Sequence, residues 1–288
     1  MSDPRMIELP VQSLGGEAAA MVRRDLLAVE EPLEIRLGFA TEDNFAHKSI
    51  SVTMRTPGSD FDLATGFLFT EGIITSADQI EQIRHCGKPV GDAQLHNVVR
   101  IDLKSGVKVD LKRLERHFYT SSSCGVCGKT SIEAVQTAAC PVLPEGPVVA
   151  AQVIHALPAS LRTAQAVFDC TGGLHASALF DADGRMLALR EDVGRHNALD
   201  KLIGHCSSAG HSLADSAIMM SSRLSVELVQ KAASVNCGII IAISAPTTLA
   251  IRQAEAAGMT LVAVARGEEF EVFTHPERIL VEDHRHVA

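Results

Sequence analysis

Two cysteines three positions apart, Cys124 and Cys127, are the residues of this chain best suited to chemistry. They lie in the segment SSSCGVCGKT, residues 121–130, between an alternating stretch at 107–111 that predicts a strand and a stretch at 132–136 that predicts a helix. The pair is therefore expected at a helix start, where unpaired amides and the helix dipole stabilise a thiolate. Nearby cations would strengthen that effect: Arg113, Arg116, His117 and Lys129.

Several kinds of site are compatible with such a pair. Two buried structural thiols are disfavoured by the flanking serines and glycines. A zinc site would need further ligands, and because no second Cys-x-x-Cys exists, His117 or His175 would have to complete it. A thioredoxin-like dithiol usually has an aromatic residue before the pair and a proline inside it, and both are absent here. The remaining alternative is a sulfur carrier, in which one thiolate accepts sulfur as a persulfide.

A phosphate-binding P-loop is excluded by one position. Residues 128–130, Gly-Lys-Thr, end the segment as a P-loop ends, but Ser123 stands where the first glycine is required. Lys129 is therefore interpreted as an electrostatic neighbour of the thiols.

Composition bounds the class of protein. The chain has 288 residues, 46% of them hydrophobic, and a formal net charge of -9, which argues against a nucleic-acid partner. No segment approaches the ~18 apolar residues of a membrane span, so no membrane partner is expected. Seven cysteines without a framework of spacings fit a reducing compartment, and a cytoplasmic protein is predicted.

The first third of the chain, residues 1–112, is predicted to be a small α+β domain. Alternating apolar residues predict strands at 33–37, 49–54 and 97–103, and a helix is predicted over 60–71, closed by Gly72.

The last third predicts a β-α-β-α-β unit. Its strands are expected at 217–220, 238–243 and 259–264, with helices over 224–234 and 247–257. Strands that are apolar on both faces, joined by short helices, predict a parallel sheet covered by helices.

Ligands of such sheets collect beyond the carboxyl ends of the strands. Those ends, residues 221–223, 244–247 and 265–267, offer hydroxyls, amides and two arginines suited to phosphate or a guanine-like ring. Arg223, Ser244, Thr247 and Arg266 are the candidate side chains. The serine and threonine side chains are equally suited to capping the helices, so both interpretations remain open.

Two polar segments precede this unit. Residues 171–180 lead through an Asp-Gly turn into a hairpin, and residues 191–197 enter a helix near Asn197. His175 and His196 lie near the ends of these loops. Such histidines are more often structural than catalytic.

Six ordered motifs together resemble the FdhD/NarQ family, the formate dehydrogenase accessory sulfurtransferases. The resemblance extends from about residue 17 to residue 279. The motifs are SSSCGVCGK (121–129), TGGLH (171–175), EDVGRHNALDK (191–201), SSR (221–223), SAPT (244–247) and THPER (274–278).

The resemblance implies a carrier that takes sulfur from a cysteine desulfurase and passes it to the molybdenum cofactor, bis-molybdopterin guanine dinucleotide, before this cofactor enters the formate dehydrogenase catalytic subunit. Cys124 corresponds to the persulfide site. Cys127, one turn further into the predicted helix, is expected from its position to release the sulfur by attack or to stabilise the persulfide. The implied cofactor-binding segment comprises Val264, Ala265, Arg266, Gly267, Glu268 and Glu269, and guanosine diphosphate would bind as a fragment of the cofactor. No resident metal is implied.

The family also implies a homodimer and a larger domain, residues 113–288, with a cytidine-deaminase-like three-layer α/β/α fold and a mostly parallel C-terminal sheet. Deaminase activity is excluded, because Ser123 precedes Cys124 and the later segment 175–177, His-Ala-Ser, has serine where the catalytic glutamate would stand. The alternative function is a non-catalytic chaperone that binds the guanine-containing cofactor and the apo-dehydrogenase.

Overall fold

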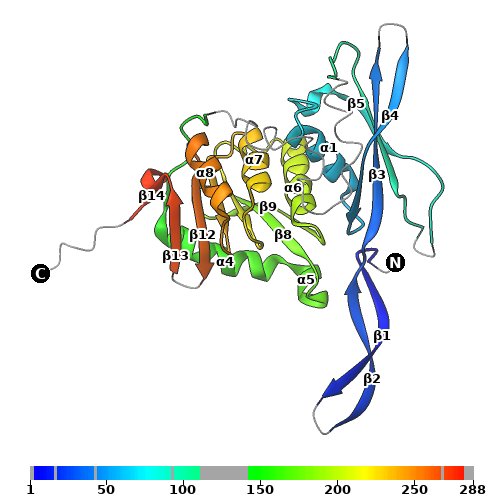
Figure 1. The fold of residues 1–288 in the computed structure, drawn as a ribbon, viewed down its shortest axis with the longest axis horizontal. Helices are drawn as coiled ribbons and strands as arrows, with labels where there is room; N and C mark the ends of the chain where they lie inside the picture. The colour runs from blue at the N-terminus through cyan, green and yellow to red at the C-terminus, as the bar shows by residue number, and fades with distance from the viewer. Residues whose placement is uncertain are drawn as a thin grey trace, which may run out of the picture.

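The computed structural model describes residues 3–15, 18–41, 44–91, 94–110, 142–266 and 269–281. Within them the chain forms a projecting two-stranded ribbon, a four-stranded sheet, a six-stranded sheet and a short two-stranded pair (Figure 1). The predicted domain boundary at 112 lies outside the described residues, as do Cys124 and Cys127. No helix in the described ranges is long and apolar enough to cross a membrane.

The ribbon and the four-stranded sheet come first. The ribbon pairs β1 (Met6–Gly15) with β2 (Ala18–Ala28). The sheet has the order β4-β3-β6-β5, and one helix, α1 (Asp60–Thr70), packs on its apolar face. Its strands are β3 (Glu31–Ala40), β4 (Phe45–Arg55), β5 (Ile80–His85) and β6 (Val98–Leu103), and a short 3-10 turn, η1 (Ala77–Gln79), precedes β5. The predicted strands at 33–37, 49–54 and 97–103 and the helix over 60–71 are thus confirmed.

The strand predicted at 107–111 is wrong for the residues that the structure describes. Residues 107–110 belong to no strand. Val107 and Val109 instead pack as an irregular segment against the core of the four-stranded sheet. Their alternation therefore reflects contact with that core.

The six-stranded sheet has the order β13-β12-β11-β10-β8-β9. Its centre is the predicted β-α-β-α-β unit, since β10, β11 and β12 are parallel. The strands are β8 (His175–Phe180), β9 (Met186–Asp192), β10 (Ala217–Met220), β11 (Ile239–Ala242), β12 (Thr260–Arg266) and β13 (Glu269–Thr274). The expectation of a mostly parallel sheet needs correction, because β8, β9 and β13 join by antiparallel pairing. Short hairpins connect these outer strands, and hairpins reverse strand direction.

Helices cover both faces of this sheet (Figure 1). One apolar core lies between the sheet and α6 (Arg195–Ala209), α7 (Val226–Ser234) and α8 (Thr248–Ala257). A second core lies on the opposite face, under α4 (Ala151–Ala164). The remaining elements are α5 (Ala166–Thr171), β7 (Val149–Ala150), β14 (Ile279–Leu280) and the 3-10 turn η3 (Pro276–Arg278). The β-branched strands are accordingly buried on both faces.

Two glycines allow α1 to pack directly on α6. A Cβ on Gly66 would overlap the backbone carbonyl of Asp200, and a Cβ on Gly204 would overlap the carbonyl of Asp62. The helices therefore meet backbone to backbone. This crossing joins the four-stranded sheet, through α1, to the six-stranded sheet.

Candidate functional site

The loops that follow β10, β11 and β12 meet at one edge of the six-stranded sheet. We call residues 221–225, 243–247 and 264–266 the carboxyl rim, because parallel strands bring their carboxyl ends together. Main-chain hydrogen bonds join the three loops: Leu224 N donates to Ala245 O at 3.4 Å, Thr247 N donates to Leu224 O at 2.9 Å and Val264 N donates to Ser244 O at 3.5 Å. The sequence prediction that these loops lie together is confirmed.

Two arginines at the carboxyl rim are exposed. Arg266, the last residue of β12, donates from Nε to Ile243 O at 3.3 Å, and Arg223 lies between β10 and α7. Neither guanidinium forms an ion pair with another residue in the described ranges. Both remain available to an anion.

The hydroxyl groups at the rim differ in whether they cap a helix. Thr247 caps α8, since its Oγ1 accepts a hydrogen bond from Ala250 N at 3.3 Å. Ser225 occupies the same position before α7 but makes no capping bond, and its buried Oγ has no partner among the described residues. The start of α7 thus offers unpaired polar groups beside Arg223.

The implied cofactor-binding segment contains a backbone outlier. Val264 has φ 56, in the left-handed region, which is rare for a β-branched residue. Pairing of β12 with β13 shifts register between Ala263 and Arg266, and Arg266 then pairs with Glu269. Ala265 is buried, whereas Gly267 and Glu268 lie outside the described residues. Outliers of this kind are concentrated at functional sites in proteins.

His175 extends the rim toward β8. It pairs with Asp192 across β8 and β9, and Ala176 N donates to Ser221 Oγ at 2.8 Å. Burial, and secondarily the nearby Arg195 guanidinium, lowers the pKa of His175, so the imidazole is neutral near pH 7. The Arg195 Nε is itself buried without a described partner.

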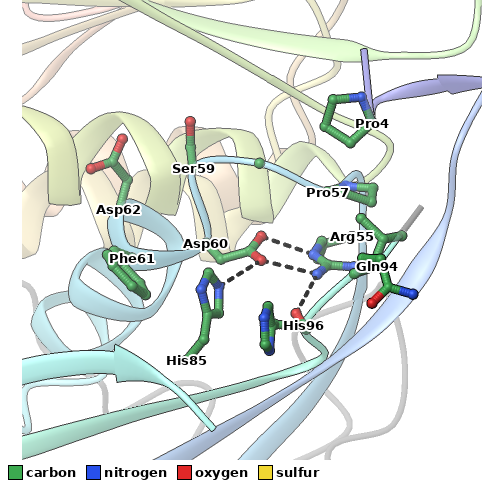
Figure 2. A pocket seen from close by; sticks show the side chains of 12 residues that line it. Pro4, Arg55, Pro57, Ser59, Asp60, Phe61, Asp62, His85, Gln94 and His96 are labelled. Atoms are coloured by element: carbon green, nitrogen blue, oxygen red, sulfur yellow. Dashed lines mark hydrogen bonds and ion pairs between the residues drawn. The ribbon is translucent and has the colours of Figure 1, made fainter. Parts of the chain in front are cut away.

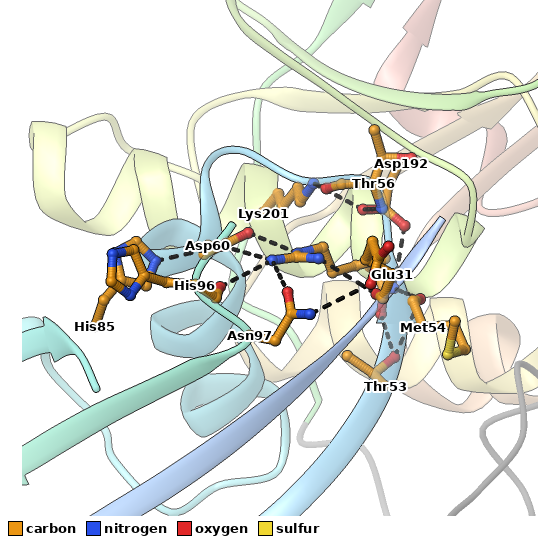
Figure 3. A network of polar contacts seen from close by, with 12 residues as sticks. Glu31, Thr53, Met54, Thr56, Asp60, His85, His96, Asn97, Asp192 and Lys201 are labelled. Atoms are coloured by element: carbon orange, nitrogen blue, oxygen red, sulfur yellow. Dashed lines mark hydrogen bonds and ion pairs between the residues drawn. The ribbon is translucent and has the colours of Figure 1, made fainter. Parts of the chain in front are cut away.

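The motif at 191–201 is buried rather than open. Lys201 Nζ lies 2.7 Å from Asp192 Oδ2, with side-chain exposures of 2% and 0%. Lys201 Nζ also donates to Thr56 O at 2.8 Å (Figure 3). Asn197 Nδ2 donates to Met54 O at 2.7 Å. We call Asp192, Asn197 and Lys201, with residues 53–56, the clasp. It ties the end of β4 to the start of α6 through Lys201 and Asn197, whereas the Arg55 guanidinium donates to Asp60.

A pocket of about 490 Å³ lies beside the clasp, near the start of α1 (Figure 2). The Arg55 guanidinium donates to both carboxylate oxygens of Asp60 at 2.9 and 3.0 Å, and His85 Nε2 lies 3.3 Å from Asp60 Oδ2. The rings of Phe61 and His85 are 4.7 Å apart, and those of His85 and His96 are stacked at 5.2 Å. Because these polar groups mostly satisfy one another, the described lining of the pocket offers mainly ring faces.

Sequence reasoning missed this pocket and the clasp. Asn197 and Lys201 stand four positions apart and thus on one face of a helix, a spacing that could have indicated a shared partner. No comparable local signal joins Arg55, His85 and His96, which come from separate elements.

Four cysteines lie in the described residues. Cys206 and Cys237 are buried, Cys86 is half-buried and Cys170 is exposed. Burial raises the pKa of Cys206 to about 12 and that of Cys237 to about 11. Neither is suited to act as a nucleophile near neutral pH.

Comparison with known proteins identifies the family. The family model described as FdhD/NarQ matches residues 28–280, which covers both sheets, the clasp, the carboxyl rim and the cysteine segment. The chain belongs to the FdhD/NarQ family.

FdhD relatives match along nearly their whole length. A protein of Mycolicibacterium paratuberculosis named sulfur carrier protein FdhD is 47% identical over 268 residues, 90% of this chain and 94% of the relative. A protein of the same name from Streptomyces avermitilis is 43% identical over 267 residues, 91% of this chain and 92% of the relative. A solved structure from Desulfotalea psychrophila, described as a formate dehydrogenase accessory protein, has a TM-score of 0.74 at 26% identity and covers 96% of this chain and 100% of its own.

The FdhD/NarQ motifs have different places in this structure. SSR and SAPT form the carboxyl rim, and TGGLH reaches it at the start of β8. EDVGRHNALDK forms the clasp. THPER lies at the opposite end of β12, where Thr274 Oγ1 donates to Met259 O at 2.7 Å and Arg278 Nη1 donates to Gly258 O at 2.8 Å.

Proposed function

We propose that the protein is a sulfur carrier for formate dehydrogenase maturation, which accepts sulfur as a persulfide on Cys124. The observation that carries the proposal is the family match over residues 28–280, which includes Cys124 and Cys127, together with relatives named sulfur carrier proteins. The sulfur donor is proposed to be a cysteine desulfurase. The acceptor is the molybdenum cofactor destined for the dehydrogenase catalytic subunit.

Sulfur is loaded by a thiol–persulfide exchange and is then transferred to the cofactor substrate. The Cys124 thiolate attacks the terminal sulfur of a persulfide on the donor, the donor's S–S bond breaks, and the donor leaves as a thiolate. In the second exchange the acceptor attacks the terminal sulfur of the Cys124 persulfide, the S–S bond breaks and Cys124 leaves as a thiolate. The cofactor substrate, taken up in its reduced form, supplies the two electrons that convert this sulfane sulfur to sulfide. Cys127 stands one helical turn further along in the predicted helix, where it can assist the release.

The carboxyl rim is proposed to hold the guanine nucleotide end of the cofactor substrate. Arg223 and Arg266 form no ion pair with a described residue, and Ser225 Oγ at the start of α7 has no partner among those residues, so this edge suits a diphosphate. Ser244 and Thr247 lie between them along the rim, and the strained Val264 adjoins Arg266. Glu269 stands opposite Arg266 in the register of β12 and β13. Because a carboxylate accepts hydrogen bonds and is negatively charged, Glu269 is better suited to a guanine N–H group than to phosphate.

Other features of the proposal follow from the family. The helix layers on both faces of the large sheet are proposed to correspond to a cytidine-deaminase-like arrangement, with the division near residue 112. A cytoplasmic homodimer is proposed.

Sulfur loading tests the proposal. After incubation with a cysteine desulfurase and cysteine, mass spectrometry is expected to find the mass of one added sulfur on the peptide containing Cys124. Cys124→Ser should abolish loading and dehydrogenase maturation, and Cys127→Ser should retain some loading. Cys170→Ser is the matched control, because Cys170 is exposed and lies on α5.

The chaperone alternative gives a different result. A chain that never gains sulfur yet still binds guanosine diphosphate and supports the dehydrogenase would be a non-catalytic chaperone. Loading confined to Cys127 would reverse the roles of the two thiols.

A further inference from the structure

The ribbon of β1 and β2 extends away from the rest of the molecule (Figure 1). Its two strands pair only with each other in the described residues, and β2 contacts the remaining chain at α5. A two-stranded ribbon alone is at best marginally stable in water. A further strand or surface is therefore needed to stabilise it.

Apolar side chains along the ribbon are exposed. Val22 is 70% exposed, and Ile7, Leu9, Leu26 and Leu27 are between 37% and 48% exposed. Isolated exposed residues are ordinary, but this group lies on two adjoining strands for which α5, at β2, is the main contact among the described elements.

The direction of the free backbone groups follows from the register. Val29 N donates to Arg5 O at 2.9 Å, so this position is of the hydrogen-bonded type within the ribbon. Pairs alternate between bonded and non-bonded along antiparallel strands. Val22, Arg24 and Leu26 therefore direct their N–H and C=O groups outward, away from β1.

The two outer edges of the ribbon differ. Pro10 pairs with Arg24 and occupies an outward position on β1, where it supplies no N–H. Proline at such a position blocks pairing with another strand. Residues 22–28 of β2 include no proline, so the outer edge of β2 can accept hydrogen bonds from a further strand and donate to it.

We propose that the open edge of β2 pairs antiparallel with β2 of a second copy of this chain, with the two-fold axis at Arg24. In that register Val22 faces Leu26 of the partner subunit. Arg23, whose Nη2 already lies 2.9 Å from Asp25 Oδ2 of its own strand, also faces Asp25 of the partner subunit. Apolar residues thus meet apolar residues and opposite charges meet. All the outward backbone groups of Val22, Arg24 and Leu26 gain partners.

The central position is also accounted for. Arg24 faces its own copy, but each Arg24 Nε already lies 2.8 Å from Glu8 Oε2 on the same ribbon, which offsets the repulsion. The resulting sheet has the order β1-β2-β2-β1, with the Pro10 edges outside. This assignment goes beyond the expectation of a dimer, because it names the surface and the register, and it depends on no step of the sulfur chemistry.

Matched proline variants of the full chain test the interface. Val22→Pro removes an outward N–H on β2, whereas Gln12→Pro removes the outward N–H of its register partner on β1, and neither removes a hydrogen bond within the ribbon. Light scattering should give twice the 30.7 kDa chain mass for the parent and for Gln12→Pro at micromolar concentration. Val22→Pro should weaken association on the order of thirtyfold, through two symmetry-related hydrogen bonds. Circular dichroism and thermal unfolding check that both variants fold.

A charge exchange gives an independent test. Arg23→Asp should weaken the dimer, because it places two carboxylates opposite one another at both ends of the contact. The same change removes the Arg23–Asp25 ion pair of its own strand, so thermal unfolding of the isolated chain is compared with the parent. The double variant Arg23→Asp with Asp25→Arg should restore both the ion pair and the dimer. A monomeric parent chain, a dimer that Val22→Pro leaves unchanged, equal loss in both proline variants, or failure of the double exchange to restore association would each overturn the proposal.

Discussion

The carboxyl rim and the clasp are both rich in polar residues, yet they use them in opposite ways. In the clasp, Asp192, Asn197 and Lys201 are buried and bonded to the end of β4. At the rim, Arg223 and Arg266 are exposed and have no ion-pair partner among the described residues. A sequence segment rich in polar residues can therefore form either a buried contact between elements or a binding surface.

Burial separates the two cases. A buried charge is stable only when paired, so the clasp has no capacity left for a ligand. An exposed guanidinium on a loop held by main-chain hydrogen bonds retains its donors. The rim is thus the region where polar groups remain available.

The strongest test of this contrast is Lys201→Ala. It leaves the Asp192 carboxylate buried without its cation, and we expect the free energy of unfolding to fall by about 3–5 kcal/mol. Denaturant unfolding followed by circular dichroism measures the change. Arg185→Ala is the control, because the Arg185–Asp181 pair has an Arg side chain 78% exposed and should contribute less than about 1 kcal/mol. Equal losses in the two variants would remove the distinction between clasp and surface.

Gly66→Ala tests the attachment from the side of α1. The added methyl group would overlap the carbonyl of Asp200, and we expect a loss of about 1–3 kcal/mol in unfolding free energy. In an open helix the same change would stabilise the protein by up to ~1 kcal/mol. The sign of the measured change therefore decides whether α1 and α6 meet backbone to backbone.

Arg223→Ala and Arg266→Ala test the rim. Each should weaken binding of guanosine diphosphate by about 1–3 kcal/mol in calorimetry, the cost of losing a charge-assisted hydrogen bond. Unfolding free energies should change by less than about 0.5 kcal/mol, because both side chains are exposed. Arg185→Ala, at the other end of the sheet, should leave affinity unchanged. Unaltered affinity in both rim variants would exclude this site, and equal binding of an adenine nucleotide would refute guanine selection.

His275 in the THPER motif lies between these extremes, because its side chain is half-buried and hydrogen-bonded within the protein. The Glu255 backbone carbonyl, with the Glu277 and Glu255 carboxylates, raises the pKa of His275. A raised pKa stabilises the fold below the unfolded value of ~6.5, and this contribution is lost as pH rises through the folded pKa. The stability difference between the parent chain and His275→Gln should therefore be largest near pH 5.5 and vanish by about pH 8.5, with a magnitude below about 1 kcal/mol. A difference independent of pH in urea unfolding would assign His275 a packing role alone.

Periodicity predicted the centre of the fold well. The apolar segments predicted at 217–220 and 238–243 are β10 and β11 in the structure. Helix α8 begins after its cap, Thr247, and ends at Gly258, as predicted. These signals are local. The antiparallel β13 beside β12 and the ribbon of β1 and β2 depend on pairing partners, which periodicity does not specify.

The candidate site was predicted in part. Parallel strand ends had to meet, so Arg223, Ser244 and Arg266 were predicted to lie along one rim. The left-handed Val264 and the unpartnered Ser225 Oγ could not be foreseen, because both result from tertiary packing. The roles of Cys124 and Cys127 stay predictions from sequence and family.

The contact through Gly66 and Gly204 limits how the molecule can move. Packed helices usually slide past one another by small rotamer changes in the side chains between them. Here backbone lies against backbone, so α1 and α6 have no such intermediate layer to rearrange. Any large displacement on partner binding is therefore expected in the ribbon of β1 and β2, with the rim and the four-stranded sheet moving as one rigid body.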